Sequence, residues 1–128
     1  MRRRKKILIV DCDADYLMTL ERGLEEAGFD TTTTWDPWEA KALLNSGEFH
    51  ALLVGEHPPE VKAKDILSGL AVPVACVVLQ AKPRHPFEAQ HLGQQGASLV
   101  VSRQKVAEVI EKVQLLLKPP QAASAGAA

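Results

Sequence analysis

Short apolar segments alternate with helical patterns along the chain. Largely apolar runs fall at residues 7–10, 51–54, 72–79 and 98–101, and a threonine-rich run falls at 29–34. Unbroken apolar runs of this length are typical of strands buried on both faces, and β-branched threonine also favours a strand. The pattern therefore predicts five strands.

Apolar residues spaced three or four positions apart predict a helix after each strand. The helices are expected between residues 13 and 28, 36 and 47, 61 and 70, 87 and 95, and 106 and 117. Asp13 or Asp15 can cap the first helix, and Asp36, Pro37 and Glu39 form a capping-box start for the second. Strict alternation of strands and helices predicts an α/β fold, with a parallel sheet covered by helices on both faces.

Size and charge narrow the function classes. A chain of 128 residues with 46% hydrophobic and 24% charged residues has the composition of one globular domain. Its formal net charge of -1 gives no general attraction to nucleic acid or membrane, and no apolar run approaches the length of a membrane span. We expect a cytoplasmic protein in which residues 1–5 are a basic lead-in, 6–118 the domain and 119–128 a disordered tail.

The two cysteines fit this compartment. Cys12 and Cys76 lie in apolar, strand-like stretches, where a reduced cysteine packs as a small hydrophobic residue. Neither belongs to a C-x-x-C pair, so a metal or redox site has no support from the cysteines.

Carboxylates gather where the first strand ends. Asp11, Asp13 and Asp15 alternate directly after the apolar run, so they should lie at the carboxyl edge of the sheet. Ligands of open α/β sheets bind at that edge, and any chemical site is therefore expected here. One interpretation is that Asp13 or Asp15 caps the first helix and that Asp11 is retained from an ancestral protein. Two others are a weak Mg²⁺ site at Asp11 and Asp13, and a small haloacid dehalogenase-like phosphatase with Asp11 as nucleophile and Asp13 as general acid.

Several short motifs occur in a characteristic order, at residues 7–11, 24–29, 39–40, 51–54, 73–74 and 96–97. Their order and spacing resemble the receiver domain of bacterial two-component response regulators over about residues 5–118. The resemblance implies a flavodoxin-like (βα)5 fold, which is a doubly wound parallel five-stranded sheet of order 2-1-3-4-5 in a three-layer α/β/α arrangement.

The phosphorylation site that the resemblance implies is largely missing. In the family, two acids after the first strand and an aspartate after the third hold Mg²⁺, and the third-strand aspartate accepts a phosphoryl group from a histidine kinase. Here Asp11 matches the first acid, Cys12 takes the place of the second, and Asp13 comes one residue late. The acceptor position falls on Gly55, and neighbouring Glu56 should point to the opposite face. These five residues form a degenerate acidic pocket, in which we expect no catalytic residue and no tight metal site.

The positions that would sense phosphorylation are changed as well. The substituted positions are Val78, Leu79 or Gln80 for the family's hydroxyl residue, Val100 for an aromatic residue, Arg103 for the lysine and Gln104 for the proline after it. We therefore expect a signalling protein, not an enzyme, that needs no cofactor and acts through phosphorylation-independent contacts with protein partners in bacterial signalling. The alternative is a phosphorelay receiver that uses a displaced acid, Asp11, Asp13 or Glu56, with Mg²⁺.

The resemblance also suggests where partners bind. In receivers, the fourth helix, fifth strand and fifth helix form the usual dimer and partner surface, which here implies Leu99, Val106, Val109 and Val113. Apolar area left exposed on that surface would imply association, including formation of a homodimer.

Two tryptophans flank the start of the second helix. Trp35 and Trp38 are expected to cover the end of a neighbouring helix by packing. The alternative is an exposed patch for a protein partner, because tryptophan is enriched at binding hot spots.

Overall fold

A computed structural model of the chain describes residues 4–47, 49–56, 61–68, 70, 74–80, 99–102 and 106–117, with the backbone alone at 99–102. Within these residues the elements are β1 (Lys6–Val10), α1 (Ala14–Glu26), β2 (Asp30–Thr34), α2 (Pro37–Ser46), β3 (Ala51–Gly55), α3 (Ala63–Leu67), β4 (Ala75–Gln80), β5 (Leu99–Ser102) and α5 (Val106–Leu117). The helix expected at 87–95, Arg103, Gln104 and the tail at 119–128 lie outside the described residues.

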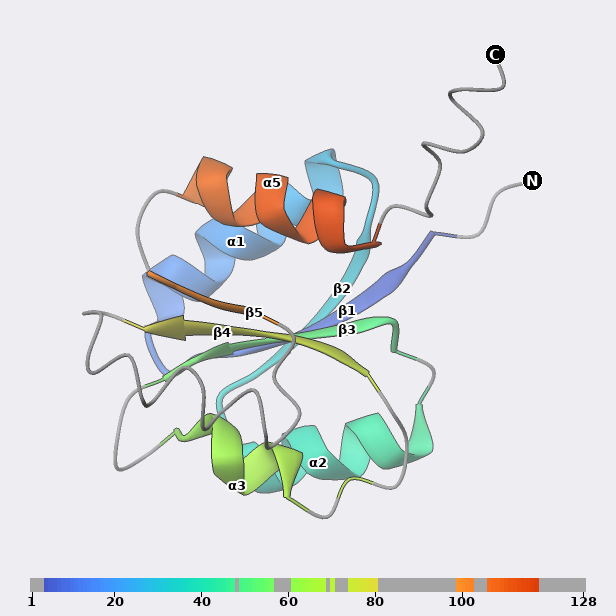
Figure 1. Cartoon of the computed structure of the whole chain (residues 1–128), viewed down its shortest axis with the longest axis vertical. Helices are drawn as coiled ribbons and strands as arrows, with labels where there is room; N and C mark the ends of the chain where they lie inside the picture. Colours follow the sequence, from blue (N-terminus) through green and yellow to red (C-terminus); the bar gives the residue numbers. More distant parts are fainter. Residues whose placement is uncertain are drawn as a thin grey trace.

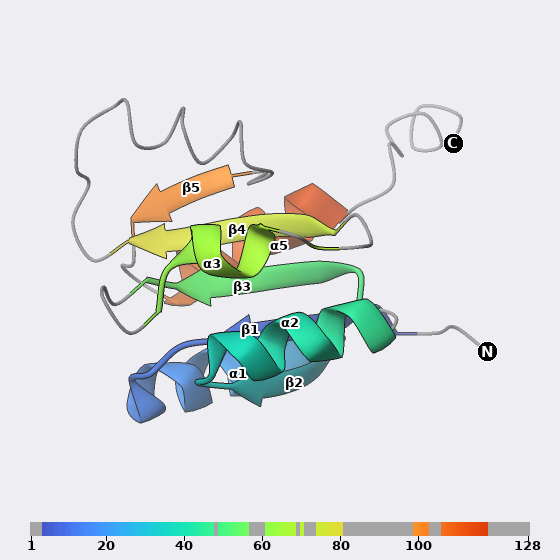
Figure 2. The ribbon, with the colours of Figure 1, turned by 90° about the horizontal axis from the view of Figure 1, so that it is seen from below.

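The strands lie parallel in one sheet, in the order β2-β1-β3-β4-β5. Helices α1 and α5 cover one face and α2 and α3 cover the other (Figure 1). Seen from the α2–α3 side, the arrowheads all point the same way, so the carboxyl ends of the strands meet at one edge (Figure 2). The parallel, flavodoxin-like α/β architecture predicted from the sequence is confirmed.

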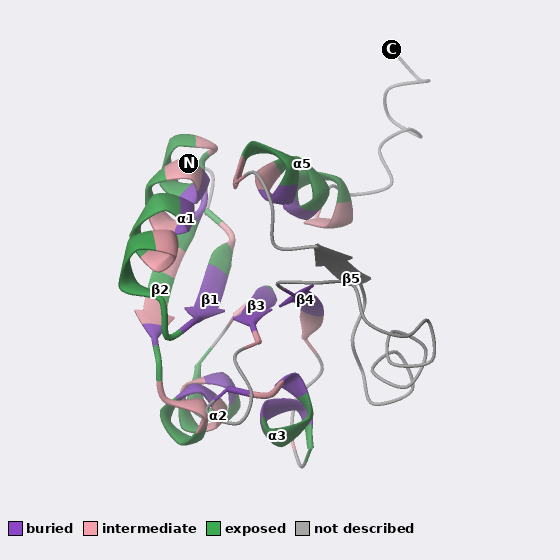
Figure 3. Ribbon diagram, turned by 90° about the vertical axis from the view of Figure 1, so that its left-hand side faces the viewer, coloured by how far each residue is buried: buried purple, intermediate pink, exposed green. Residues whose placement is uncertain are grey.

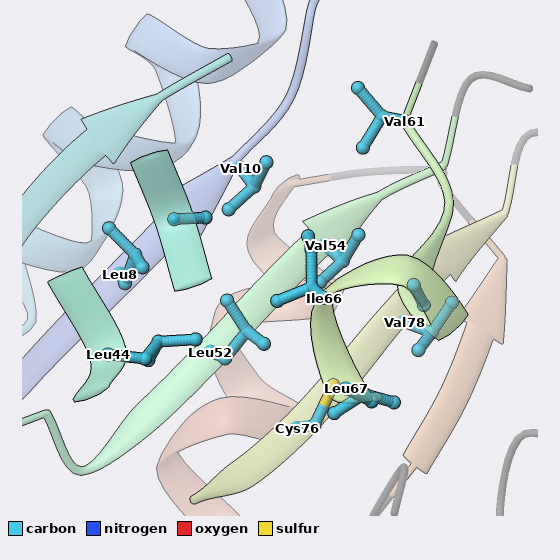
Figure 4. Packing of buried hydrophobic residues seen from close by; sticks show 12 residues of the cluster. Leu8, Val10, Leu44, Leu52, Val54, Val61, Ile66, Leu67, Cys76 and Val78 are labelled. Carbon is cyan, nitrogen blue, oxygen red and sulfur yellow. The ribbon is translucent and has the colours of Figure 1, made fainter. Parts of the chain in front are cut away.

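Apolar layers on the two faces of the sheet form the core. Ile7 and Ile9 of β1 face α1 and α5, whereas Leu8 and Val10 face α2 and α3. All four side chains are fully buried. Figure 4 shows the α2–α3 layer, where Ile66 packs toward the strands. The unbroken apolar runs are thus explained, because a strand covered on both faces has no polar side.

Local signals set the ends of α1. The Asp13 carboxylate caps the helix by accepting hydrogen bonds from the backbone N–H groups of Asp15 (3.1 Å) and Tyr16 (3.2 Å). The helix ends before Gly28, which has a φ of 100°. Glycine adopts this left-handed conformation without steric penalty, so the chain can turn into β2.

The start of α2 differs from the predicted capping box. Asp36 does cap the helix, because its carboxylate accepts a hydrogen bond from the Trp38 N–H (3.0 Å). The Glu39 carboxylate, however, accepts from the Thr34 hydroxyl, and the Asp36 N–H donates to Thr34 Oγ1 (3.1 Å). The prediction that Glu39 closes the box is wrong, since the buried Thr34 stands between the two groups. This relay ties the end of β2 to the start of α2.

Lys5, the last residue of the basic lead-in, has a structural role. Its Nζ donates a hydrogen bond to the carbonyl oxygen of Leu117 at 2.6 Å. Leu117 ends α5, where the last carbonyls lack partners within the helix and the helix dipole favours a cation. In the described part of the chain, no helix has the length and apolar character needed to cross a membrane.

Candidate functional site

The predicted acidic pocket lies where β1 and β3 end side by side. Val10 pairs with Val54 in the parallel ladder, so the next residues, Asp11 and Gly55, meet at the carboxyl edge of the sheet. Alternation along the strands directs both toward the α1–α5 face. The same alternation directs Glu56 toward the α2–α3 face, as predicted.

Asp11 fills the space that a side chain at position 55 would occupy. A Cβ atom built on Gly55 would lie 2.0 Å from Asp11 Oδ2 and 2.7 Å from Asp11 Cγ, well inside van der Waals contact. Asp11 is only 1% exposed, and its Oδ1 accepts a hydrogen bond from the Asp13 N–H at 2.8 Å. Its own N–H donates to the Thr34 carbonyl oxygen at 3.2 Å. The carboxylate therefore lies over Gly55, and a side chain at position 55 would require it to move.

Glu56 bridges three elements on the opposite face of the sheet. Its Oε2 accepts a hydrogen bond from the N–H of Ala63, the first residue of α3, at 2.9 Å. Its Oε1 accepts from Nε2 of Gln80, the last residue of β4, at 3.0 Å. The Glu56 N–H donates to the Leu79 carbonyl oxygen at 2.9 Å. Because the side chain of Lys62 makes no cap for α3, Glu56 supplies the anion at the start of that helix.

The two cysteines lie in different environments. Cys12 is exposed, so the prediction that it packs as a small hydrophobic residue is wrong. The reason is that β1 ends at Val10, which leaves Cys12 in the following loop. Cys76 is buried as predicted. Burial, and to a smaller extent the negative charge of Glu56, raises the pKa of the Cys76 thiol to about 12.

The two acids of the predicted Mg²⁺ site, and the β4 residues expected to sense phosphorylation, can be placed in the structure. Within the described ranges, no cluster of three or more His, Cys, Asp or Glu side chains could hold a metal ion. The Asp13 carboxylate caps α1 and that of Asp11 lies over Gly55, so the two acids of the predicted weak Mg²⁺ site serve different structural roles. Val78 and Leu79 are fully buried and apolar. The weak Mg²⁺ site stays a prediction.

Much of the predicted partner surface on α5 belongs to the core. Val109 and Val113 are 2% and 0% exposed and pack in the α1–α5 layer, so their assignment to a contact surface is wrong. Val106 is half-buried against the same layer, and the side chain of Leu99 lies outside the described part. Helix α1 packs against α5, and this side of α5 therefore faces α1 and the sheet.

The tryptophans show the opposite behaviour. Trp35 is 69% exposed and Trp38 is 78% exposed. The packing interpretation is therefore wrong, and the alternative of an exposed aromatic patch is the one that the structure supports. The Lys41 ammonium lies 5.4 Å from the centroid of the Trp38 ring, within the range of a cation–π contact.

The sequence is similar to curated response regulators. It is 28% identical over 118 residues to the transcriptional regulatory protein PrrA of Mycobacterium tuberculosis, and 30% identical over 120 residues to PrrA of Mycobacterium leprae. Each match covers 88% of this chain and 50% of the relative, so the chain spans about half the length of these proteins. No protein-family model matches the sequence.

Solved structures share the fold. The receiver domain of Francisella response regulator 1452 has a TM-score of 0.79 at 21% identity, with 88% of this chain and 96% of that chain covered. A Burkholderia pseudomallei response regulator, solved with a phosphorylated aspartic acid and a calcium ion, has a TM-score of 0.72 at 22% identity, with 90% and 75% covered. The chain thus has the fold of response regulator receiver domains, and PrrA response regulators are its relatives in sequence.

Proposed function

We propose that this chain is a receiver-type module of two-component signalling that acts through phosphorylation-independent protein contacts in the cytoplasm and catalyses no reaction. The position of the Asp11 carboxylate over Gly55 carries the proposal. Glycine has no group to accept a phosphoryl group, and the volume where an acceptor side chain would stand is filled. The Asp11 carboxylate accepts a hydrogen bond from the Asp13 N–H, which holds it in this position, so the side chain of Asp11 occupies the pocket.

The positions of the acids disfavour phosphorylation at a displaced site. Asp11 is 1% exposed, which keeps a phosphoryl donor from its oxygens, and the same obstacle applies to a phosphatase nucleophile. The Asp13 carboxylate caps α1. The Glu56 oxygens accept hydrogen bonds from α3 and β4, which a phosphoryl group on Glu56 would break. Each acid has a structural role that phosphorylation would oppose.

Amide NMR spectra of the full chain test this proposal. We expect weak, local shifts near Asp11 and Asp13 with Mg²⁺, and no further shifts when beryllofluoride, a phosphoryl mimic, is added. The B. pseudomallei response regulator is a suitable positive control, because its structure contains a phosphorylated aspartic acid. Large shifts around Gly55 that spread to β5 and α5 would overturn the proposal in favour of a displaced acceptor, which Glu56→Gln and Asp13→Asn variants would then locate. Hydrolysis of a phosphate ester that requires Asp11 would show a phosphatase instead.

A further inference from the structure

Exposed aromatic surface gathers at the start of α2. Trp35 and Trp38 are the only two tryptophans of the chain, and both are mostly exposed. Trp38 lies in line with Ala42 and Asn45, which are also exposed, and we call these four residues the α2 surface. Tryptophan is a side chain that proteins normally cover, and it is enriched where partners bind.

We propose that the α2 surface binds the α2 surface of a second copy of this chain in a twofold-symmetric dimer. The inference rests on the proposed function in one respect, which is that protein contacts are the means by which the module acts. It uses a different surface from the one that the resemblance implied, because α5 directs most of its apolar stripe into the core.

Three of the four residues share one side of α2, and Trp35 lies two residues before the helix begins. At about 100° per residue, Trp38, Ala42 and Asn45 fall on one side of the helix. The opposite side carries Ala40 and Leu44, which are buried against the sheet. Figure 3 shows this division, with exposed residues on the outer side of α2 and buried ones toward the strands. The small side chain of Ala42 leaves space beside Trp38 for a second helix to approach.

The turn that carries the tryptophans is preorganised. Asp36 lies between them and caps α2 through the Trp38 N–H. The Thr34 hydroxyl donates to Glu39 and accepts from the Asp36 N–H, so the backbone on both sides of Trp35 is fixed. A partner that binds a rigid surface loses less conformational entropy, which favours association.

The charges beside the α2 surface are self-complementary. Lys41 lies on one flank of Trp38, and Glu39 lies on the other flank of the helix. A twofold axis parallel to α2 places the Glu39 flank of one copy against the Lys41 flank of the other, and it does so twice. An antiparallel pair would bring like flanks together. Opposite charges arranged in this way favour a second copy in the parallel orientation.

The exposed aromatic area suits a protein interface. At 69% and 78% exposure, the two indole side chains leave roughly 350 Å² uncovered. A standard interface buries about 800 Å² on each partner, so the tryptophans alone supply nearly half of it. Ala42, Asn45 and the flanking charges extend the surface along α2.

Sedimentation equilibrium and tryptophan fluorescence test the dimer directly. The expected result is a mass that rises from 13.9 kDa toward twice that value with concentration, with a parallel blue shift of the emission. The fluorescence reports on this surface alone, because Trp35 and Trp38 are the only tryptophans. Trp38→Glu should raise the dissociation constant at least about tenfold. Leu115→Glu is the matched control, since Leu115 is 65% exposed on α5, and it should leave the dimer intact.

Charge reversal tests the orientation. Lys41→Glu and Glu39→Lys should each weaken the dimer, because each places like charges together on both flanks; Glu39→Lys also removes the acceptor of the Thr34 hydroxyl. An equimolar mixture of the two variants should form a heterodimer with opposite charges restored on both flanks. Recovery on mixing requires two folded variants, so it separates loss of contact from unfolding.

Either of two results would overturn the inference. One is a monomer at concentrations up to about 1 mM with tryptophans that stay accessible to acrylamide; a partner of another kind would then cover the α2 surface. The other is a dimer that Trp38→Glu leaves unchanged. Neither result bears on the proposed function, because that proposal is tested by the response to beryllofluoride. A response to beryllofluoride would refute the proposed function even if the dimer forms.

Discussion

Replacement of Gly55 by alanine is a sensitive test of the closed pocket. The substitution adds one methyl group, whose carbon would lie 2.0 Å from Asp11 Oδ2. The Asp11 carboxylate must therefore move, although it is buried and accepts a hydrogen bond from the Asp13 N–H. We expect Gly55→Ala to destabilise the protein. A glycine-to-alanine change inside a strand usually has the opposite effect and stabilises a protein by about 0.5–1 kcal/mol.

The magnitude follows from two contributions. Overpacking a filled site costs about 1–3 kcal/mol, and loss of a hydrogen bond to a carboxylate costs about 1.5–3 kcal/mol. Because the carboxylate can relax in part, we expect the free energy of unfolding to fall by about 2–5 kcal/mol. In an Asp11→Ala background the two atoms closer than 3 Å are absent, and the Cβ of residue 11 lies 3.4 Å away, which is an ordinary contact. In that background Gly55→Ala should change the free energy of unfolding by less than about 0.5 kcal/mol.

Urea unfolding of the wild type, the two single variants and the double variant measures this difference as a coupling energy. We expect a coupling of about 2–4 kcal/mol between positions 11 and 55. A Gly55→Ala cost that is equally large in both backgrounds would show that Asp11 is not the group displaced. A negligible cost in the wild-type background would show that the space over Gly55 is open, and the argument for a closed phosphoacceptor position would fail.

Three further predictions concern groups around the sheet. Glu56→Ala should lower the free energy of unfolding by about 2–4 kcal/mol in urea, because α3 and β4 each lose a hydrogen bond to a carboxylate; an unchanged midpoint would contradict the bridging role. Lys5→Met should lower the free energy of unfolding by about 1 kcal/mol, because the end of α5 loses the cation that binds the Leu117 carbonyl oxygen. Arg4→Met removes an exposed neighbouring cation and should leave the free energy of unfolding unchanged. At pH 9 a thiol reagent should modify Cys12 alone in the folded protein and both cysteines in urea, since the pKa of Cys76 is raised to about 12. The folded state then retains a proton that the unfolded chain releases, so stability should fall as the pH rises from 9 toward 12, and Cys76→Ala should reduce that fall.

The elements of the fold were predictable because their signals are local. An apolar run such as 7–10 marks a strand covered on both faces, and Asp13 and Gly28 mark the two ends of a helix through backbone chemistry that acts over a few residues. Period-two alternation also separated Glu56 from Gly55 correctly. That Gly55 stands at the acceptor position follows from the resemblance to receiver domains and stays a prediction.

What the sequence left undecided depends on which surfaces meet. The apolar stripe of α5 is equally compatible with a partner or with α1, and only the packing of the two helices shows that Val109 and Val113 belong to the core. In the same way, no local rule states that Asp11 lies over Gly55, 44 positions later, or that Trp35 and Trp38 remain exposed. Strand and helix periodicity predicted the alternating strands and helices and the parallel sheet, whereas the strand order came from the resemblance to receiver domains. The closure of its pocket and the exposure of its α2 surface were decided by tertiary structure, because both arise from contacts between residues far apart in the chain.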